Sequence, residues 1–305
     1  MAYGSAEKYM LIGTETAWGT GVTADKDVGI VIDATHGGSR EVIQSRGLSS
    51  IEAKAINTGM RDDTHSVSVE FQHGRLLEYV FGGVSHDETT GDWVHTYTVA
   101  AAAPSFTAEY GDNSTVDTVS THTGSTVTSA ELTMALDQTL QLKVEMVGKT
   151  FTTGTTTSAA AIDALVVFPH PLCSFTINSE TPSEVQEATL KFTKKVERAG
   201  GLGSELYQSS NVTELACEFS AKLGFDAKTQ HDLFADNTTF TVVFTADNGT
   251  SLGSGQRKLT ITLADCSLSS MEETVSVGDL VFLDISGVGV FSAATSTDDI
   301  SSAAW

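Results

Sequence analysis

One short segment of the sequence gathers side chains that could bind a metal ion. The segment HDETTGDWVH supplies imidazole and carboxylate groups from His86, Asp87, Glu88, Asp92 and His95. Zinc is bound by these groups, but their spacing matches no established ligand pattern and no HExxH motif is present. The same residue types are typical of a solvated hairpin tip. We therefore interpret the segment as a hairpin tip and expect no metal and no cofactor.

Other patterns that could do chemistry are incomplete. The oxygen-rich segments 111–117 and 245–251 lack the regular ligand spacing and terminal Glu of a calcium loop, and turn formation explains their Asn and Asp content. Ser5 and Lys8 have a serine–lysine spacing without a partner motif, and no G-x-S-x-G or Walker loop occurs. We predict that the protein is not an enzyme.

The three cysteines are far apart, at Cys173, Cys217 and Cys266, with no CxxC or Cys/His spacing. This pattern indicates neither a disulfide framework nor a zinc site, so we expect buried, reduced thiols.

The charge balance is acidic, with 39 Asp and Glu residues against 17 Lys and Arg residues and a net charge of −22. Such a surface repels phosphate backbones and anionic membranes. Solubility or adaptation to a salty medium would also explain it, and a halophilic host is compatible. No apolar run approaches the roughly 18 residues of a spanning helix, and the N-terminus lacks a basic region followed by an apolar block. We expect synthesis in a cytoplasm and no membrane anchor.

Alternation of apolar and polar residues dominates the chain and predicts a mostly β fold. The candidate strands are 28–34, 66–71, 95–100, 105–110, 130–136, 140–147, 188–196, 214–223, 240–246, 258–266 and 281–291. Residues 137–139 suit a tight hairpin, and Asn248-Gly249 suits a turn.

Two short amphipathic helices interrupt the strands. The first is expected within 74–83, with Leu76, Leu77, Val80 and Phe81 packing inward and Gly82-Gly83 ending it. The second is expected within 227–236, with Asp226 as its cap and Leu233 and Phe234 packing inward.

The order of elements repeats after roughly 140–150 residues, which indicates a duplicated domain. We predict two β-sandwich domains at 1–150 and 165–294, a linker at 151–164 and a C-terminal tail at 295–305 that is disordered or docked through Trp305. Each domain would carry one flanking helix and one long inter-strand loop, at 35–63 and 197–211. The alternative is a chance resemblance between two β-rich halves.

Three segments in the first half resemble, in order, motifs of the tail tube proteins of long-tailed viruses of bacteria or archaea. The opening combines Gly13, Glu15, Trp18, Gly19 and Thr20 with a later R-E-x-x-x-S-R segment. HSVSVEFQHGRLLEYVFGG resembles the strand and helix of that family, and ELTMALDQTLQLKVEMVGK resembles its closing strands. The second half matches more loosely.

The resemblance implies a structural virion protein whose β-sandwich domains form rings, with the rings stacked into a hollow tube for genome ejection. It implies ring-stacking contacts through the first loop, at Arg40, Glu41, Ser45, Arg46 and Arg61, and second-copy contacts at Arg198, Glu205 and Tyr207. Rings of three chains with pseudo-six-fold symmetry are favoured over rings of six chains. The implied partners are other copies of the chain, tail tip or baseplate and tail terminator proteins, and, in a negatively charged lumen, the tape-measure protein and duplex DNA without specific binding.

Two other functions fit a β-rich acidic chain. An exported adhesin or cell-surface-layer module would need an export signal, which we do not find. A carbohydrate-binding or hydrolytic sandwich would need clustered aromatics or paired carboxylates, whereas Trp18, Trp93 and Trp305 are dispersed.

Overall fold

The computed structural model describes residues 8–46, 55–89, 91–100, 104–112, 119–154, 166–182, 184–224, 229–236, 238–252, 255–274, 281–301 and 305. Strands make up 73% of the model and helices 6%, which confirms the mostly β prediction. No helix in the described part of the chain has the length and apolar character needed to cross a bilayer.

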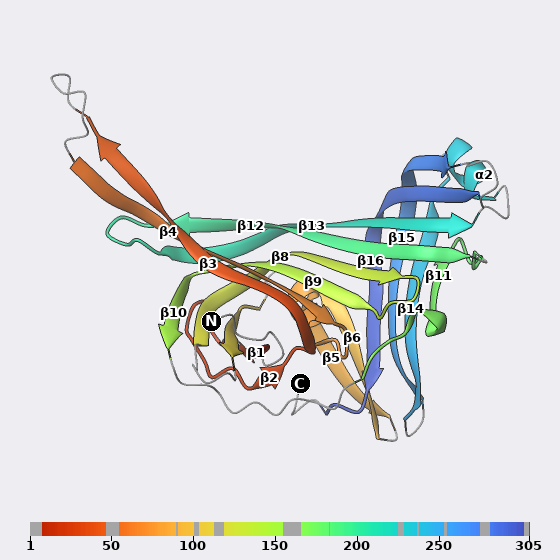
Figure 1. Cartoon of the computed structure of the whole chain (residues 1–305), viewed down its shortest axis with the longest axis horizontal. Coiled ribbons are helices and arrows are strands. Elements are labelled where there is room, and N and C mark those ends of the chain that lie inside the picture. The colour runs from red at the N-terminus through yellow and green to blue at the C-terminus, as the bar shows by residue number, and fades with distance from the viewer. Residues whose placement is uncertain are drawn as a thin grey trace, which may run out of the picture.

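The strands follow the predicted alternation closely (Figure 1). In the first half they are β1 Lys8–Thr14, β2 Lys26–Asp27, β3 Ile30–Ser45, β4 Ala55–Glu70, β5 Gly82–Thr89, β6 Asp92–Val99, β7 Phe106–Asp112, β8 Val119–Ala135, β9 Gln141–Gly148 and β10 Thr150–Gly154. In the second half they are β11 Cys173–Ile177, β12 Val185–Gly200, β13 Tyr207–Gly224, β14 Phe240–Ser251, β15 Gln256–Thr274 and β16 Phe282–Asp298, and a short 3-10 helix, η2, spans His170–Leu172.

Strand β8 belongs to two layers of the first half. Its beginning pairs with β7 and β10, and β7 also pairs with β1. Its end pairs with β9, which continues the order to β4 and β3. Because β8 passes from one layer to the other, the two layers enclose a common core.

The second half repeats this pairing pattern. Strand β15 pairs first with β14, which pairs with β11, and the order β15-β16-β13-β12 corresponds to β8-β9-β4-β3. The register shifts correspond as well. One between Val31 and Asp33 matches one between Val185 and Glu187. Another, between Val127 and Ser129 in β8, matches one between Leu268 and Ser270 in β15.

The two halves are joined by hydrogen-bonded strands. Strand β8 pairs with β12 in antiparallel register from Ser129↔Thr193 to Ala135↔Glu187, which makes one continuous curled sheet. The predicted linker at 151–164 begins inside β10, and its residues from 155 onward lie outside the described part. Strand β16 continues to Asp298, so the first four residues of the segment expected as a tail at 295–305 are strand.

Both expected helices are present, α1 Arg75–Phe81 and α2 Thr229–Ala235. Gly82 ends α1 at φ 103°, where a side chain would be strained, and its N–H donates to the Glu78 carbonyl. Leu76, Leu77, Val80 and Phe81 are buried, and so is Leu233 on α2. Phe234, expected to pack inward, is 44% exposed, because α2 turns that position away from the sheet. The expected cap Asp226 lies outside the described residues.

The core connects the two halves. Phe81 of α1 packs against Phe192 of β12 and Phe291 of β16, with ring centroids 5.0 and 4.3 Å apart. Each large buried side chain of this kind stabilises the fold by about 1.5–3 kcal/mol. Cys217 and Cys266 are buried and Cys173 is half-buried, and all three are free thiols. Burial raises the pKa of each thiol to about 11.

Two sequence predictions need correction. The described residues of the long polar loops predicted at 35–63 and 197–211 are mostly continuations of β3–β4 and β12–β13, and these strand pairs project as antiparallel ribbons (Figure 1). Asn248-Gly249 is also not the hairpin turn. Gly249 lies within β14 with φ 74°, at a shift in the register between β14 and β15. The chain reverses further along, where the Leu252 N–H donates to the Gly255 carbonyl.

Candidate functional site

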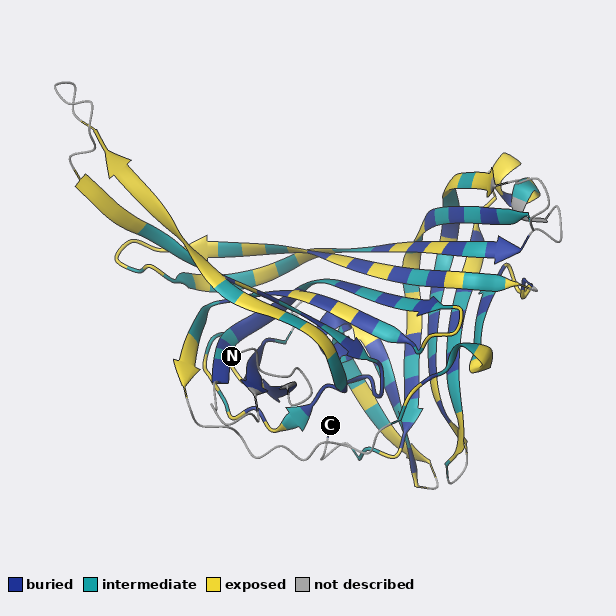
Figure 2. Ribbon diagram, in the orientation of Figure 1, coloured by how far each residue is buried: buried dark blue, intermediate teal, exposed yellow. Residues whose placement is uncertain are grey.

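A projecting arm is the most exposed feature of the molecule (Figure 2). We define the arm as Arg40–Arg46, at the end of β3, and Ala55–Arg61, at the start of β4. The predicted residues Arg40, Glu41, Ser45, Arg46 and Arg61 all lie on it. The apolar side chains of Val42, Ile43 and Ile56 are also exposed on the arm, and Ile56 is the most exposed of the three, at 67%. Exposed apolar groups on a projecting ribbon are typical of a protein–protein contact.

The structure brings the two predicted loops together. The Arg40 guanidinium is 2.9 Å from the Glu205 carboxylate, and the Arg61 N–H donates to the Glu205 carbonyl at 2.8 Å. The Arg198 guanidinium binds the Asp62 carboxylate at 2.7 Å and lies over the Tyr207 ring, 4.2 Å from its centroid. Sequence analysis found both groups of residues but not their contact.

Among the strand edges without a partner in the described part of the chain, two lie at the opposite ends of the order β3-β4-β9-β8-β12-β13-β16-β15. Strand β3 pairs only with β4. The last part of β15, from Ser267 to Thr274, pairs only with β16, because β14 ends its pairing with β15 at Cys266. Such edges expose unpaired N–H and C=O groups that can pair with another chain.

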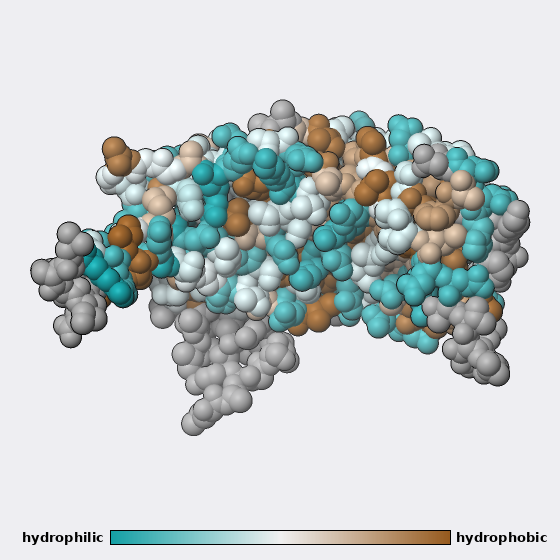
Figure 3. All heavy atoms as spheres, turned by 90° about the horizontal axis from the view of Figure 1, so that it is seen from above, coloured by the Kyte–Doolittle hydropathy of each residue, from teal (hydrophilic) through white to brown (hydrophobic). Residues whose placement is uncertain are grey.

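The outward face of the continuous sheet is polar and mostly acidic. Alternation places the core side chains on one face and the charged side chains on the other. The carboxylates of this face are Asp33, Glu70, Glu131, Glu145, Glu187, Glu218, Glu272 and Asp284, and the ammonium groups are Lys143, Lys191 and Lys222. Shallow grooves follow it across β8, β12, β13 and β16. From above, Figure 3 shows hydrophilic and near-neutral groups over the middle of the molecule.

Hydrogen bonds order parts of this polar face. The Ser129 hydroxyl donates to the Glu145 carboxylate at 2.9 Å, and this bond lowers the pKa of Glu145. Lys191 lies 3.7 Å from Glu218 across the β12–β13 pair. The face therefore keeps an excess of negative charge at neutral pH.

The end of the sheet opposite the arm carries an apolar groove. The β8–β9 turn lies at that end. The short helix η2 is held against this turn by a hydrogen bond from the His170 N–H to the Gln138 carbonyl. A groove of about 240 Å³ lies beside them, lined by residues that include Met134, Pro171 and Phe175. Leu136 and Leu172 are exposed next to it.

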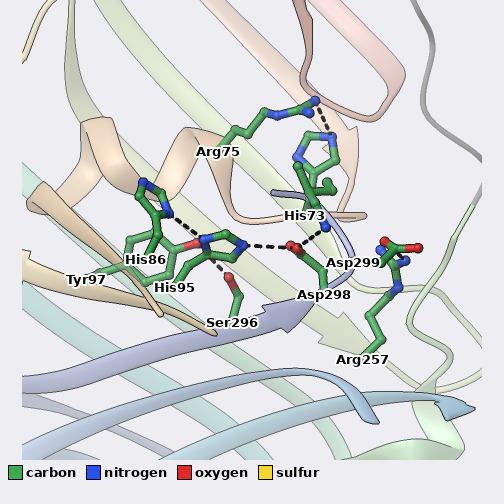
Figure 4. A network of polar contacts seen from close by, with 10 residues as sticks. His73, Arg75, His86, His95, Tyr97, Arg257, Ser296, Asp298 and Asp299 are labelled. Atoms are coloured by element: carbon green, nitrogen blue, oxygen red, sulfur yellow. Dashed lines mark hydrogen bonds and ion pairs between the residues drawn. The ribbon is translucent and has the colours of Figure 1, made fainter. Parts of the chain in front are cut away.

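The segment considered as a metal site lies on the β5–β6 hairpin, as predicted, but Asp92 and His95 are buried and not solvated. Figure 4 shows the polar network that His86 and His95 form. His86 Nδ1 lies 2.6 Å from His95 Nδ1, and His95 Nε2 lies 3.0 Å from the Asp298 carboxylate at the end of β16. The Trp305 ring stacks on His95 at 3.6 Å. These residues anchor the C-terminal segment, while Asp87 and Glu88 point to solvent.

An almost wholly β molecule with unpaired edges at both ends of its main strand order, a projecting arm and an acidic sheet face has the features expected of a self-associating structural protein. A family model described as phage tail tube protein matches residues 5–289, and the chain belongs to this family. A search of curated proteins found no match. Membership makes the protein a non-enzymatic structural component of the virion tail.

Proposed function

We propose that the protein polymerises as stacked rings into a hollow tail tube through which genomic DNA passes into the host. One observation carries the proposal: the chain contains an internal copy of the junction that a ring requires. Strand β8 of the first half pairs with β12 of the second half. The corresponding strands, β15 and β3, stand at the two ends of the order β3-β4-β9-β8-β12-β13-β16-β15, and each has a free edge there.

The register of the missing junction follows from the internal one. Val31, Asp33 and Ala34 correspond to Val185, Glu187 and Ala188, because both trios pair with matching residues across the same bulge. Ser129 corresponds to Ser270 by the same reasoning in β8 and β15. Since Ser129 pairs with Thr193, Ser270 of one chain should lie opposite Ser39 of the next.

This pairing joins the two end strands of neighbouring chains and closes the strand order into a ring. Each chain supplies β3-β4-β9-β8 and β12-β13-β16-β15 to one continuous barrel wall, so two similar units come from each chain. Three chains then give pseudo-six-fold symmetry. A ring of six chains would place one unit of each chain outside the wall. That arrangement would leave unused one of the two corresponding junctions, β8–β12 within a chain and β15–β3 between chains.

Stacking follows from the opposite ends of the sheet. Val42, Ile43 and Ile56 extend from one end, and the apolar groove by Leu136 and Leu172 lies at the other. An arm directed toward the next ring can place its apolar side chains against that groove.

The acidic face supplies the lining of the channel. Carboxylates that face the lumen repel the phosphates of duplex DNA, so DNA and the tape-measure protein pass without specific binding. The open ends of the tube would contact the tail tip or baseplate and the tail terminator. Subunits made in the host cytoplasm would assemble there.

Disulfide crosslinking tests both the pairing and the ring size. A Ser39→Cys, Ser270→Cys double variant should, after assembly and oxidation, give covalent trimers on non-reducing gels. A Thr35→Cys, Ser270→Cys variant, four residues out of register on β3, is the matched control and should remain mostly uncrosslinked. Electron microscopy of the same samples should show tubes. Covalent hexamers would overturn the three-chain ring, and tubes without crosslinks would overturn the β3–β15 pairing.

A further inference from the structure

Three side chains that can bind a metal ion meet at the base of the arm. Asp63 and His65 are two residues apart on β4 and therefore share a face, and His122 approaches them from β8. One ligand atom from each residue lies within 4.8 Å of the other two. The Asp63 carboxylate is 2.8 Å from His122 Nδ1.

Three of the four ring nitrogens of His65 and His122 have no protein partner among the described residues. Neither ring nitrogen of His65, nor Nε2 of His122, has a hydrogen-bond partner among the described residues. His65 is only 4% exposed and His122 is fully buried. Leaving a buried polar atom unpaired costs about 1–3 kcal/mol, so three such atoms in one place require a compensating interaction.

Aromatic rings surround the buried cluster. Tyr110 meets His65 and His122 edge-on, at 5.8 and 5.4 Å, and Phe151 stacks on His122 at 5.6 Å. On β3, His36 is directly opposite His65, and its ring lies 5.8 Å from that of His122. His36 is exposed, so this side gives an ion a route from solvent.

The residue types of the cluster suit a divalent cation. An imidazole ring offers a nitrogen lone pair to a metal ion, and a carboxylate group offers oxygen ligands and a compensating charge.

We propose that Asp63, His65 and His122 bind one divalent transition-metal ion of the zinc class, with the fourth coordination position facing His36. Two imidazoles and one carboxylate suit Zn²⁺, whose bonds of about 2.0–2.2 Å require only small side-chain movements to bring the three ligands together. Bound metal would fasten β4, at the base of the arm, to β8. This role in holding the arm depends on the proposed tube function, but the binding itself does not.

Metal content of the full-length protein, without a histidine tag, tests the proposal. After removal of metal with a chelator, addition of Zn²⁺ and gel filtration, the wild-type protein should retain about one Zn²⁺ per chain by mass spectrometry. Co²⁺ in its place should give the visible absorption of tetrahedral coordination. Wild-type protein that retains no Zn²⁺ would overturn the proposal without any variant.

Variants then assign the ligands. His65→Gln and His122→Gln should each lower Zn²⁺ retention at least tenfold, whereas His231→Gln on α2 removes one imidazole away from the cluster and should retain the full amount. Equal retention by all three would overturn the assignment. Tube formation is scored separately by electron microscopy, so zinc binding without tubes counts against the proposed function and not against the metal site.

Discussion

Arg40 on β3 and Glu205 in the β12–β13 turn form an ion pair at 2.9 Å that links the two projecting hairpins. Both side chains are about half exposed, at 44% and 53%, so solvent screens their attraction. Arg198 lies deeper, with its side chain 14% exposed, and it contacts Asp62, Tyr207 and the Gly148 carbonyl. The inner arginine therefore holds the base of the arm, and the outer pair adds little.

This difference predicts unequal effects of two alanine substitutions. Arg198→Ala should lower the free energy of unfolding by about 2 kcal/mol, because it removes a partly buried ion pair and a cation–π contact. Arg40→Ala should lower it by less than about 0.5 kcal/mol. Urea unfolding of the two variants at matched ionic strength measures both values. Equal losses would contradict the assignment of the anchor to Arg198.

The exposed apolar side chains of the arm should be needed for tube growth but not for folding. A Val42→Ser, Ile43→Ser, Ile56→Ser variant should keep the wild-type unfolding midpoint, because these side chains contact little in the single chain. It should form few or no long tubes by electron microscopy and sedimentation. Val99→Ser, which also replaces an exposed apolar residue but lies at the end of β6, is the control and should polymerise normally. Normal tubes from the arm variant would exclude these contacts from stacking.

The sequence predicted which face of each strand is buried but not which strands pair. Period-two alternation places Leu132 and Leu190 in the core, yet it is satisfied by many pairings, so the β8–β12 junction and the free edges were not predictable from it. The projecting hairpins were missed for a related reason. Polar residues on both faces of residues 37–46 look like a loop, since an arm outside the core has no apolar face.

The alternation pattern of β4 points to the buried histidine cluster. His65 continues the inward phase of Val67, Val69 and Phe71, and Asp63 continues it one step further. Polar residues in that phase indicate a polar site inside the fold. Their partner His122 comes from another strand, and only the three-dimensional arrangement identifies it.

Reversing charge on the sheet face should make assembled tubes bind DNA. Glu131→Lys, Glu187→Lys, Glu218→Lys replaces three carboxylates on adjoining strands, so phosphates that were repelled would be attracted. Short duplex DNA should co-sediment with these tubes. The fraction of DNA that co-sediments should fall steeply as the salt concentration is raised from about 50 to about 200 mM. Asp87→Lys, Glu88→Lys on the β5–β6 hairpin is the control outside the proposed lumen. DNA retained equally by control tubes would exclude a special role for the sheet face.

Acid should destabilise the fold partly through His73. Burial, together with Arg75 and Arg257, lowers the pKa of His73 well below 6.5, so the folded state holds it neutral. Below pH 6.5 the unfolded chain binds a proton that the folded chain does not, and stability falls by up to about 1.4 kcal/mol per pH unit. Urea unfolding from pH 7.5 to 5 should show a shallower decline for His73→Gln than for the wild type. Above pH 7 the plots of unfolding free energy against pH should be parallel for the two proteins, because His73 is neutral in both the folded and the unfolded chain there. Identical slopes for the two proteins between about pH 5 and 6 would contradict the prediction.

Lys194 should act in the same direction as His73 but in the alkaline range, where stability gains from it as the pH rises. Its ammonium is buried between the halves, where it donates to the Tyr79 carbonyl at 2.7 Å, and burial lowers its pKa from 10.5 to about 8. Between these two values the unfolded chain keeps a proton that the folded chain has released, so the contribution of Lys194 to stability rises by up to about 1.4 kcal/mol per pH unit.

Other groups also titrate in this range, because burial raises the pKa of the three thiols and of Tyr79 and Tyr97 and so removes stability at high pH. Lys194→Met keeps those groups, so the difference in unfolding free energy between wild type and variant isolates the lysine. Urea unfolding at pH values of about 7.5, 8.5 and 9.5 measures that difference across the titration. The unfolding free energy of the wild type should increase steadily relative to that of the variant. A constant difference across the series would show that Lys194 keeps its ordinary pKa in the folded protein.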